Sequence, residues 1–205
     1  MRQGKKMSIV TLVSGGLDSS LMALLVKEEK IEQFPLFIDY GQICKVKEWR
    51  ACNTVFKKYN LPQPVIMNIN GYGKLISSGL TDPNKRVNED AFLPGRNLLF
   101  LLVGSAYAYQ NNCNAVAIAL LSEKNSIFPD QTNTFIYMAQ QMIDLALGRD
   151  IKIIAPLMEF SKVEVLHLAA EKGISGTYSC HSGTDTPCGK CVSCIERINA
   201  MKGGK

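Results

Sequence analysis

The sequence has no hydrophobic run long enough to cross a membrane. A transmembrane helix takes about 18–20 consecutive apolar residues, and no apolar stretch approaches that length. The run at residues 9–13 is interrupted by Ser14-Gly15-Gly16, which leaves it shorter than the core of about 7–15 apolar residues in a signal peptide. We therefore expect a cytoplasmic protein with no membrane partner.

The chain also lacks blocks of charge of one sign. Its 205 residues include 23 lysines and arginines against 18 acidic residues, a net charge of +5. Nowhere do five like charges follow one another, so a basic tail for nucleic acid is not expected. A mild positive balance suits an anionic small ligand such as a nucleotide. With 46% hydrophobic and 20% charged residues, the composition excludes disorder along the whole length.

Short apolar runs alternate with segments of helical periodicity. Strands are predicted at residues 9–13, 34–38, 65–69, 115–121 and 151–154, and helices after Gly16 and at residues 46–59, 98–109, 135–146 and 163–170. This alternation predicts an α/β fold, with a parallel sheet of about five strands and helices on both faces. Residues 70–95 lack clear periodicity, and a loop of that length in a compact domain is usually functional.

A loop rich in serine and glycine follows the first predicted strand. Residues 14–19 read Ser-Gly-Gly-Leu-Asp-Ser and match neither of the two commonest nucleotide-binding loops. Adjacent glycines let backbone N–H groups face one point without Cβ atoms in the way, and the next helix directs its positive end there. A plain strand–helix turn is the simpler alternative, but the whole hexapeptide after a buried strand favours a phosphate-binding loop.

Four of the seven cysteines lie close together near the end of the sequence. They are Cys180, Cys188, Cys191 and Cys194. Four such thiolates suit a structural, tetrahedral Zn²⁺ site. An iron–sulfur cluster competes, because Cys-x₂-Cys-x₂-Cys also occurs in ferredoxins, but the upstream position of the first cysteine favours zinc. His181 adjoins Cys180, yet we favour ligation by cysteine alone. We expect residues 1–175 to form the α/β domain and residues 176–205 a zinc-binding segment packed on it.

The hexapeptide resembles the pyrophosphate loop of the N-type ATP pyrophosphatases, which have an adenine-nucleotide alpha-hydrolase-like, Rossmann-like fold. The resemblance implies that ATP and Mg²⁺ bind here. The ATP-binding residues that it implies are Ser14, Gly15, Gly16, Leu17, Asp18, Ser19, Asp39 and Tyr40, the last two at the end of the second strand, where adenine lies. It also implies a functional lysine after the last strand, and Lys162 fits; a solvated helix lysine is the alternative.

A narrower resemblance rests on the order of several motifs. They are residues 13–19, Asp39-Tyr40-Gly41-Gln42, Leu93-Pro94-Gly95-Arg96-Asn97, Phe128-Pro129-Asp130, Pro156-Leu157-Met158 and the cysteines. Together they resemble the QueC family of 7-cyano-7-deazaguanine synthases from about residue 8 to about residue 200. That family adenylates 7-carboxy-7-deazaguanine, forms the amide with ammonia, and dehydrates the amide to the nitrile with a second ATP.

The resemblance implies an ATP-dependent C–N ligase that forms AMP and pyrophosphate. Its implied catalytic residues are Asp18, Arg96 and Lys162, and its implied substrate-binding residues are Gln42, Arg96, Asn97, Pro129 and Asp130. Arg96 suits a phosphate or carboxylate clamp, with a surface ion pair as the alternative. Asn97 could instead cap its helix. Small pyrophosphatases often dimerise, so a homodimer is expected.

The acceptor side departs from the family pattern. Gln42-Ile43-Cys44 stands where the family usually reads Gln-Arg-His, and residues 119–132 keep only Ser126, Pro129 and Asp130 of its usual sequence. We therefore expect a diverged enzyme that joins the deazaguanine to an amine of a partner protein, as in QueC-like paralogues of antiviral defence operons. An ammonia-using nitrile synthase of queuosine biosynthesis remains the other reading. A tRNA thiolase and a nucleotide sensor without turnover are further rivals.

Overall fold

A five-stranded parallel sheet forms the centre of the molecule. The structure, a computed structural model, describes residues 7–203. The strands are β1 Ser8–Val13, β2 Glu32–Asp39, β3 Val65–Asn68, β4 Ala115–Ala117 and β5 Lys152–Ile154. Their order is β3-β2-β1-β4-β5, and every neighbouring pair is parallel. The predicted α/β fold, with about five parallel strands, is confirmed.

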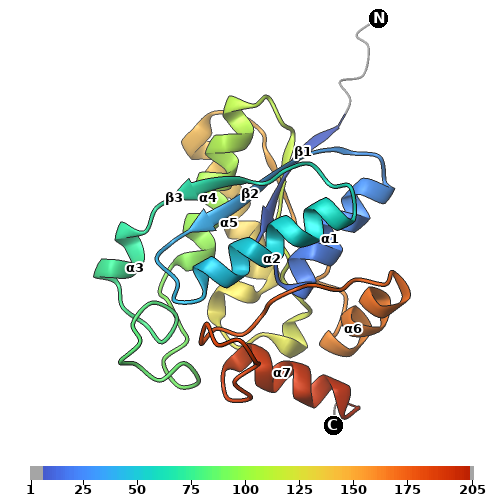
Figure 1. Cartoon of the computed structure of the whole chain (residues 1–205). Helices are drawn as coiled ribbons and strands as arrows, with labels where there is room; N and C mark the ends of the chain where they lie inside the picture. The colour runs from blue at the N-terminus through green and yellow to red at the C-terminus, as the bar shows by residue number, and fades with distance from the viewer. Residues whose placement is uncertain (1–6, 204–205) are drawn as a thin grey trace, which may run out of the picture.

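Helices cover both faces of this sheet (Figure 1). The α-helices are α1 Leu17–Glu28, α2 Lys45–Lys58, α3 Gly71–Leu75, α4 Arg96–Gln110, α5 Asn133–Leu147, α6 Lys162–Glu171 and α7 Val192–Met201. Two short 3-10 helices, η1 Glu123–Asn125 and η2 Pro129–Gln131, lie between β4 and α5. Among the described helices, none combines the length and apolarity that crossing a bilayer requires.

Alternate residues of β1 divide the core into two layers. Val10 and Leu12 pack with the buried side chains of α4 and α5. Ile9 packs with α1 and α6 on the other face, and Val13 packs with α1 and α2. Because β1 is buried on both faces, its sequence is a nearly continuous apolar run rather than an alternating one.

The chain reverses its direction across the sheet at β1. It passes from β1 outward to β2 and β3, and then returns to place β4 on the other side of β1. In open α/β sheets, such a reversal opens a crevice at the carboxyl ends of the strands, where ligands bind. The serine–glycine loop follows β1 directly and therefore lies at this crevice.

Three expectations about secondary structure need correction. The strand predicted at residues 115–121 ends at Ala117, and the chain then leaves the sheet after one further hydrogen bond, from the Ile118 N–H to the carbonyl of Ile154. Residues 70–95 contain the short helix α3, and buried Leu80 and Leu93 attach the rest to the core. The third difference is α7, which the cysteine spacing did not predict.

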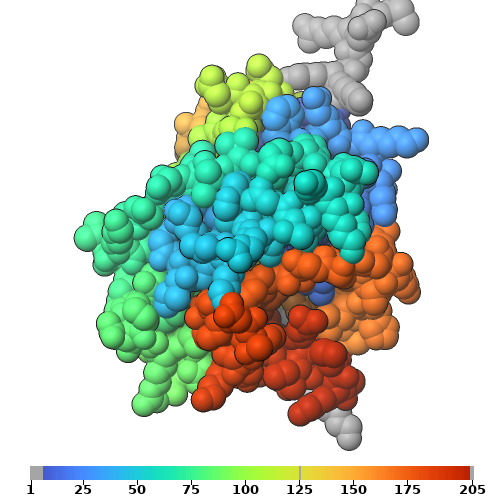
Figure 2. Space-filling view, in the orientation of Figure 1, coloured from blue at the N-terminus to red at the C-terminus, as the bar shows by residue number. Residues whose placement is uncertain are grey.

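The chain after α6 crosses back over the front of the molecule. The space-filling view shows the residues between α6 and α7 running below α2, with a hollow between this segment and α7 (Figure 2). Tyr59 Oη on α2 donates to the carbonyl of Gly173 and accepts from the N–H of Ser175. A boundary at residue 175 stays a prediction.

Candidate active site and metal centre

The serine–glycine loop is held by its own hydroxyl groups. Ser19 Oγ accepts from the N–H of Ser14 at 3.2 Å and lies 3.1 Å from Ser14 Oγ. Ser14 Oγ in turn accepts from the N–H of Gly16 at 3.3 Å. Gly16 is the N-cap of α1 and makes no side-chain cap. The positive end of α1 therefore faces the cavity next to the loop, as an anion site requires.

The two glycines have different tasks. Gly15 has a φ of +78°, and a Cβ there would lie 2.4 Å from the carbonyl oxygen of Glu48 and 2.6 Å from the nitrogen of Cys52. Only glycine fits between the loop and α2. Gly16 has an ordinary φ of −74°, and its missing Cβ leaves space beside the hydroxyls of Ser14 and Ser179.

Lys162 and Asp18 form an ion pair at the mouth of the loop. Lys162 Nζ donates to both carboxylate oxygens of Asp18 at 2.8 Å. Lys162 is the first residue of α6, where a capping box between Ser161 and Glu164 fixes the start of the helix. The side chain of Lys162 is only 11% exposed, so it is not the solvated helix lysine of the alternative interpretation.

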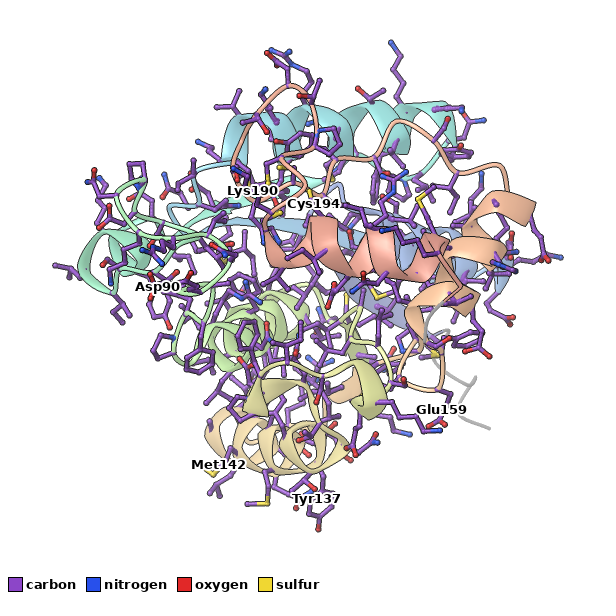
Figure 3. The ribbon with its side chains drawn as sticks, turned by 90° about the horizontal axis from the view of Figure 1, so that it is seen from below. Asp90, Tyr137, Met142, Glu159, Lys190 and Cys194 are labelled. Atoms are coloured by element: carbon purple, nitrogen blue, oxygen red, sulfur yellow. The ribbon has the colours of Figure 1, made fainter. Side chains whose placement is uncertain are left out.

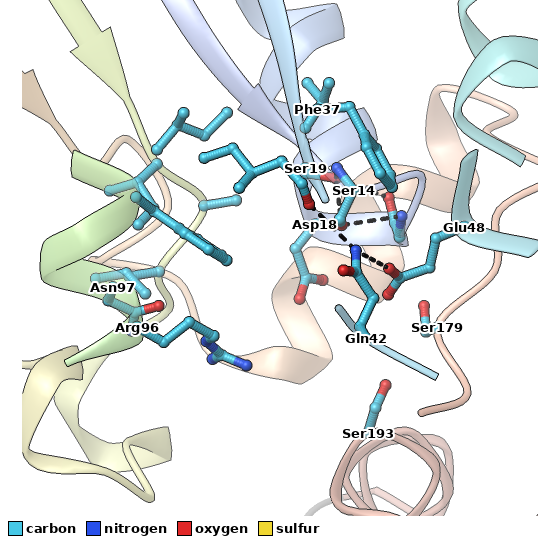
Figure 4. A pocket seen from close by; sticks show the side chains of 18 of the residues that line it. Ser14, Asp18, Ser19, Phe37, Gln42, Glu48, Arg96, Asn97, Ser179 and Ser193 are labelled. Carbon is cyan, nitrogen blue, oxygen red and sulfur yellow. Dashed lines mark hydrogen bonds between the residues drawn. The ribbon is translucent and has the colours of Figure 1, made fainter. Parts of the chain in front are cut away.

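One cavity of about 260 Å³ extends from this loop across the ends of β1, β2 and β4 (Figure 4). Its apolar lining comprises Leu12, Val13, Leu36, Phe37, Ile38, Phe100, Ile118, Ala119 and Leu120. Tyr40, expected beside adenine, also lines it, and burial raises the pKa of its hydroxyl. Asp39 does not line it: one carboxylate oxygen accepts from the N–H of Gly41 and the other pairs with Lys45 at 2.9 Å.

Gln42 and Glu48 form a buried polar pair beside the cavity. Gln42 Nε2 donates to Glu48 Oε2 at 3.1 Å and to the carbonyl of Ile38, while its Oε1 accepts from the N–H of Tyr40. Burial raises the pKa of the Glu48 carboxyl, whereas hydrogen bonds from Gln42 and Cys44 and the charge of Arg96 lower it. Both residues line the cavity, and the sequence singled out only Gln42.

Arg96 and Asn97 open α4 on the opposite side of the cavity (Figure 4). The Arg96 guanidinium lies 5.9 Å from the centroid of the Phe100 ring, and its buried Nε has no partner. Asn97 Nδ2 donates to the carbonyl of Asp130 at 3.0 Å. Asn97 lines the cavity and also fastens η2 to α4, whereas Asp130 and the exposed Pro129 are not among the lining residues. The neighbouring residue Gln131 does line the cavity.

The segment after α6 and the first turn of α7 supply lining residues that the sequence did not single out. They are Tyr178, Ser179, His181 and Ser193. The N–H of Tyr178 donates to the carbonyl of Gly15 at 2.9 Å, which places this segment against the phosphate loop. Burial, with the charges of Arg96 and Lys162, lowers the pKa of His181 to about 4. The sequence interpretation considered His181 only as a substitute metal ligand.

The four clustered cysteines converge on one point. Their Sγ atoms all lie within 4.8 Å of one another, close to the edge of about 3.8 Å that four sulfurs at about 2.3 Å from a tetrahedral Zn²⁺ define. The N–H groups of Lys190 and Cys191 donate to Cys188 Sγ, and that of Cys188 donates to Cys180 Sγ. This donor set fits a metal ion held by four thiolates.

Helix α7 carries two of these ligands. Cys191 is its N-cap, and Cys194 lies in its first turn (Figure 3). The cluster packs against Val87 and Tyr178. The cysteine cluster therefore connects three parts of the chain: residues 70–95, the segment between α6 and α7, and α7 itself. Cys44 and Cys52 are buried thiols outside this group.

Comparisons with known proteins agree with this arrangement. A family model described as "Queuosine biosynthesis protein QueC" matches residues 8–204. A 7-cyano-7-deazaguanine synthase of Prochlorococcus marinus (strain MIT 9312) is 33% identical over 216 residues, covering 97% of this chain and 95% of the relative. One from Campylobacter jejuni subsp. doylei is 28% identical, covering 93% of this chain and 92% of the relative.

Solved structures share the fold at lower identity. The NMN synthetase of Francisella tularensis aligns with a TM-score of 0.56 at 16% identity, covering 98% of this chain and 78% of that one. The U34-tRNA thiolase NcsA of Methanococcus maripaludis, solved with its [4Fe-4S] cluster, aligns with a TM-score of 0.57 at 16% identity, covering 97% of this chain and 66% of that one. These structures support the adenine-nucleotide alpha-hydrolase-like fold.

Proposed function

Because the chain belongs to the QueC family, we propose that it uses ATP to activate the carboxylate of 7-carboxy-7-deazaguanine and transfers the acyl group to a nitrogen nucleophile. The observation that carries this proposal is that one cavity is lined by the phosphate loop on one side and by Arg96 on the opposite side (Figure 4). Such a cavity has room for two anionic groups that must react with each other.

The chemistry explains why ATP is needed. A carboxylate at neutral pH resists attack by an amine, because it is an anion with no good leaving group. Attack of one carboxylate oxygen on the α-phosphorus of ATP forms the acyl-adenylate and expels pyrophosphate. The amine then attacks the acyl carbon, AMP leaves, and the amine nitrogen loses a proton. Donors fixed where charge develops supply most of the acceleration in such sites.

Residues in and beside the cavity suit these steps. The N–H groups and hydroxyls of residues 14–19, together with Lys162, would bind the departing pyrophosphate. Asp18 keeps a 27% exposed side chain beside the loop, and its carboxylate oxygens are the ligand type that Mg²⁺ prefers. Mg²⁺ bound there would neutralise phosphate charge. The four cysteines would hold Zn²⁺ as a structural ion, because no ligand position is left open.

Two versions of the second step, in which the nitrogen nucleophile attacks the acyl-adenylate, are possible. We favour an enzyme that stops at an amide, because no described side chain of residues 121–130 is among the cavity lining. A site without fixed polar contacts from these residues suits a single transfer to a bulky amine, such as one on a partner protein of a defence system. The alternative is the two-step reaction with ammonia, in which the site would activate the amide with a second ATP and release the nitrile for queuosine biosynthesis.

Pyrophosphate release tests the activation step. The protein is incubated with ATP and Mg²⁺, with and without 7-carboxy-7-deazaguanine. We expect pyrophosphate only when the acid is present. A protein that binds ATP yet releases no pyrophosphate with the acid is a nucleotide sensor, and that result would overturn the proposed activity.

A further inference from the structure

Two buried side-chain nitrogens at the cavity have no hydrogen-bond partner among the described residues. They are Nε of Arg96 and Nδ1 of His181, and both residues line the same cavity. Buried polar groups in folded proteins are almost always hydrogen-bonded. Two such atoms, brought together from segments far apart in the sequence, therefore indicate a ligand group that completes them.

These two groups come from elements other than the phosphate loop. Arg96 begins α4, whereas His181 follows Cys180 in the segment after α6. Ser193, in the first turn of α7, also lines the cavity. In Figure 4, Arg96 and Ser193 lie across the cavity from Ser14. The loop thus has its own donors, and a second group of donors faces it.

The charges of the reactants explain the need for two groups of donors. Adenylation brings a carboxylate against the α-phosphate, and two anions in a confined cavity repel each other. The loop and the amino end of α1 meet the phosphates. A guanidinium, an imidazole N–H and a serine hydroxyl are suitable donors for a carboxylate.

We propose that Arg96, His181 and Ser193 form the binding site for the carboxylate of the acid to be adenylated, with His181 donating from Nδ1. This proposal rests on the proposed function, since it names the group that the same cavity recognises. His181 also determines specificity, because its N–H donor favours an anionic carboxylate over a neutral amide.

The four-cysteine cluster positions two of these three side chains. His181 follows the ligand Cys180, and its backbone N–H interacts with the Cys191 thiol. Ser193 lies between the ligands Cys191 and Cys194 on α7. Two of the three donors are therefore placed by the four-cysteine cluster. The phosphate loop, by contrast, is built from the turn between β1 and α1.

Equilibrium binding to the metal-loaded protein tests the proposal. The probes are 7-carboxy-7-deazaguanine and the corresponding neutral amide, each titrated in the presence of α,β-methylene-ATP, which cannot release pyrophosphate. The test variant is His181→Leu. His181→Asn retains an amide N–H near the position of Nδ1 and tests rescue. His167→Leu, at an exposed position on α6, is the matched control.

We expect His181→Leu to weaken binding of the acid about ten- to a hundredfold, as loss of a hydrogen bond to a charged group does. Binding of the amide and of α,β-methylene-ATP should change by less than about threefold on the same scale. His181→Asn should recover most of the loss, and His167→Leu should match the wild type.

Two results would overturn the carboxylate site while leaving the proposed function intact. One is unchanged acid affinity in His181→Leu. The other is an equal loss of affinity for acid, amide and nucleotide, which would mean that His181 only maintains structure. Failure of the wild type to bind the acid at all would instead overturn the proposed function, and the carboxylate site with it.

Discussion

Lys162 Nζ lies 2.8 Å from each of the two carboxylate oxygens of Asp18. The ion pair joins the first turn of α1 to the first residue of α6. Glu196 on α7 lies close enough that Lys162 and Asp18 influence its carboxyl, whose pKa is raised by burial. A phosphate entering the loop therefore meets a lysine that is already held in place.

A double substitution can distinguish a catalytic role of the Asp18–Lys162 ion pair from a structural one. Asp18→Asn and Lys162→Met should each lower kcat/KM for pyrophosphate release by about 100-fold or more. Each should also cost roughly 1–2 kcal/mol of stability, because one charge is left without its partner. The double variant should regain most of that stability, as measured by thermal unfolding, but none of the activity. Full activity in the double variant would make the pair purely structural.

The two loop glycines should respond differently to alanine. At Gly15 the positive φ alone costs about 1–2 kcal/mol, and the backbone of α2 leaves no room for Cβ, so Gly15→Ala should unfold at a clearly lower temperature. Gly16→Ala should unfold within a few degrees of the wild type, since its φ is ordinary, but should bind ATP more weakly. Equal thermal stability of both variants would contradict this assignment.

Removing one thiolate should destabilise the segment that carries the metal. Cys191→Ser should lose bound metal and roughly 3 kcal/mol or more of stability, because metal-binding free energy is also folding free energy. Elemental analysis and thermal unfolding measure both. Cys113→Ser removes a buried thiol outside the cluster and should keep the metal. A colourless protein with one zinc per chain is expected, whereas a brown protein would indicate an iron–sulfur cluster.

Glu48 should make stability depend on pH. Burial raises its folded-state pKa above the ordinary 4.5, so between these two values the folded protein binds more protons than the unfolded chain, and stability falls as pH rises. The melting temperature of Glu48→Gln relative to wild type should therefore increase as pH rises above about 4.5. Glu159→Gln, at the surface in Figure 3, controls for loss of one negative charge. A difference that does not vary with pH would contradict this prediction.

The product distinguishes the two acceptor proposals. Mass spectrometry after incubation with 7-carboxy-7-deazaguanine, ATP and ammonium should show the amide as the end product, because a site selective for a carboxylate binds the neutral amide poorly. Efficient formation of the nitrile, with two ATP consumed per product, would establish the ordinary synthase reaction instead.

The phosphate loop could be predicted because its information is local. Residues 14–19 combine a buried strand, two glycines and three hydrogen-bonding side chains in one turn, and the structure builds that turn from the same residues. The alternation of apolar runs and helical periods likewise predicts every strand of the described sheet. The apolar run at residues 115–121 predicts a longer strand than β4, which ends at Ala117. Residues 118–120 are apolar because they line the cavity, not because they extend the sheet.

The far side of the cavity could not be predicted in the same way. His181 reaches it because its segment folds back over the first strand–helix turn, where the N–H of Tyr178 donates to the carbonyl of Gly15, and Ser193 reaches it from α7. Cysteine spacing does not reveal that path. Glu48 looks like a glutamate placed to suit the amino end of a helix. The helix α7 did leave a signal in the sequence, since Val192, Ile195 and Ile198 recur at steps of three, close to the helical period.

The central position of β1 also bears on how the chain folds. The pairing of Ser8 with Glu32 joins residues that are separated in sequence by one helix, α1. The pairing of Ile9 with Ala115 joins residues that are much farther apart in sequence. Contacts distant in sequence form late, because loop closure must precede them. An intermediate with β1, β2 and β3 assembled would expose the other edge of β1, and an unpaired edge is a template for intermolecular pairing. Recovery from denaturant is therefore expected to fall as protein concentration rises.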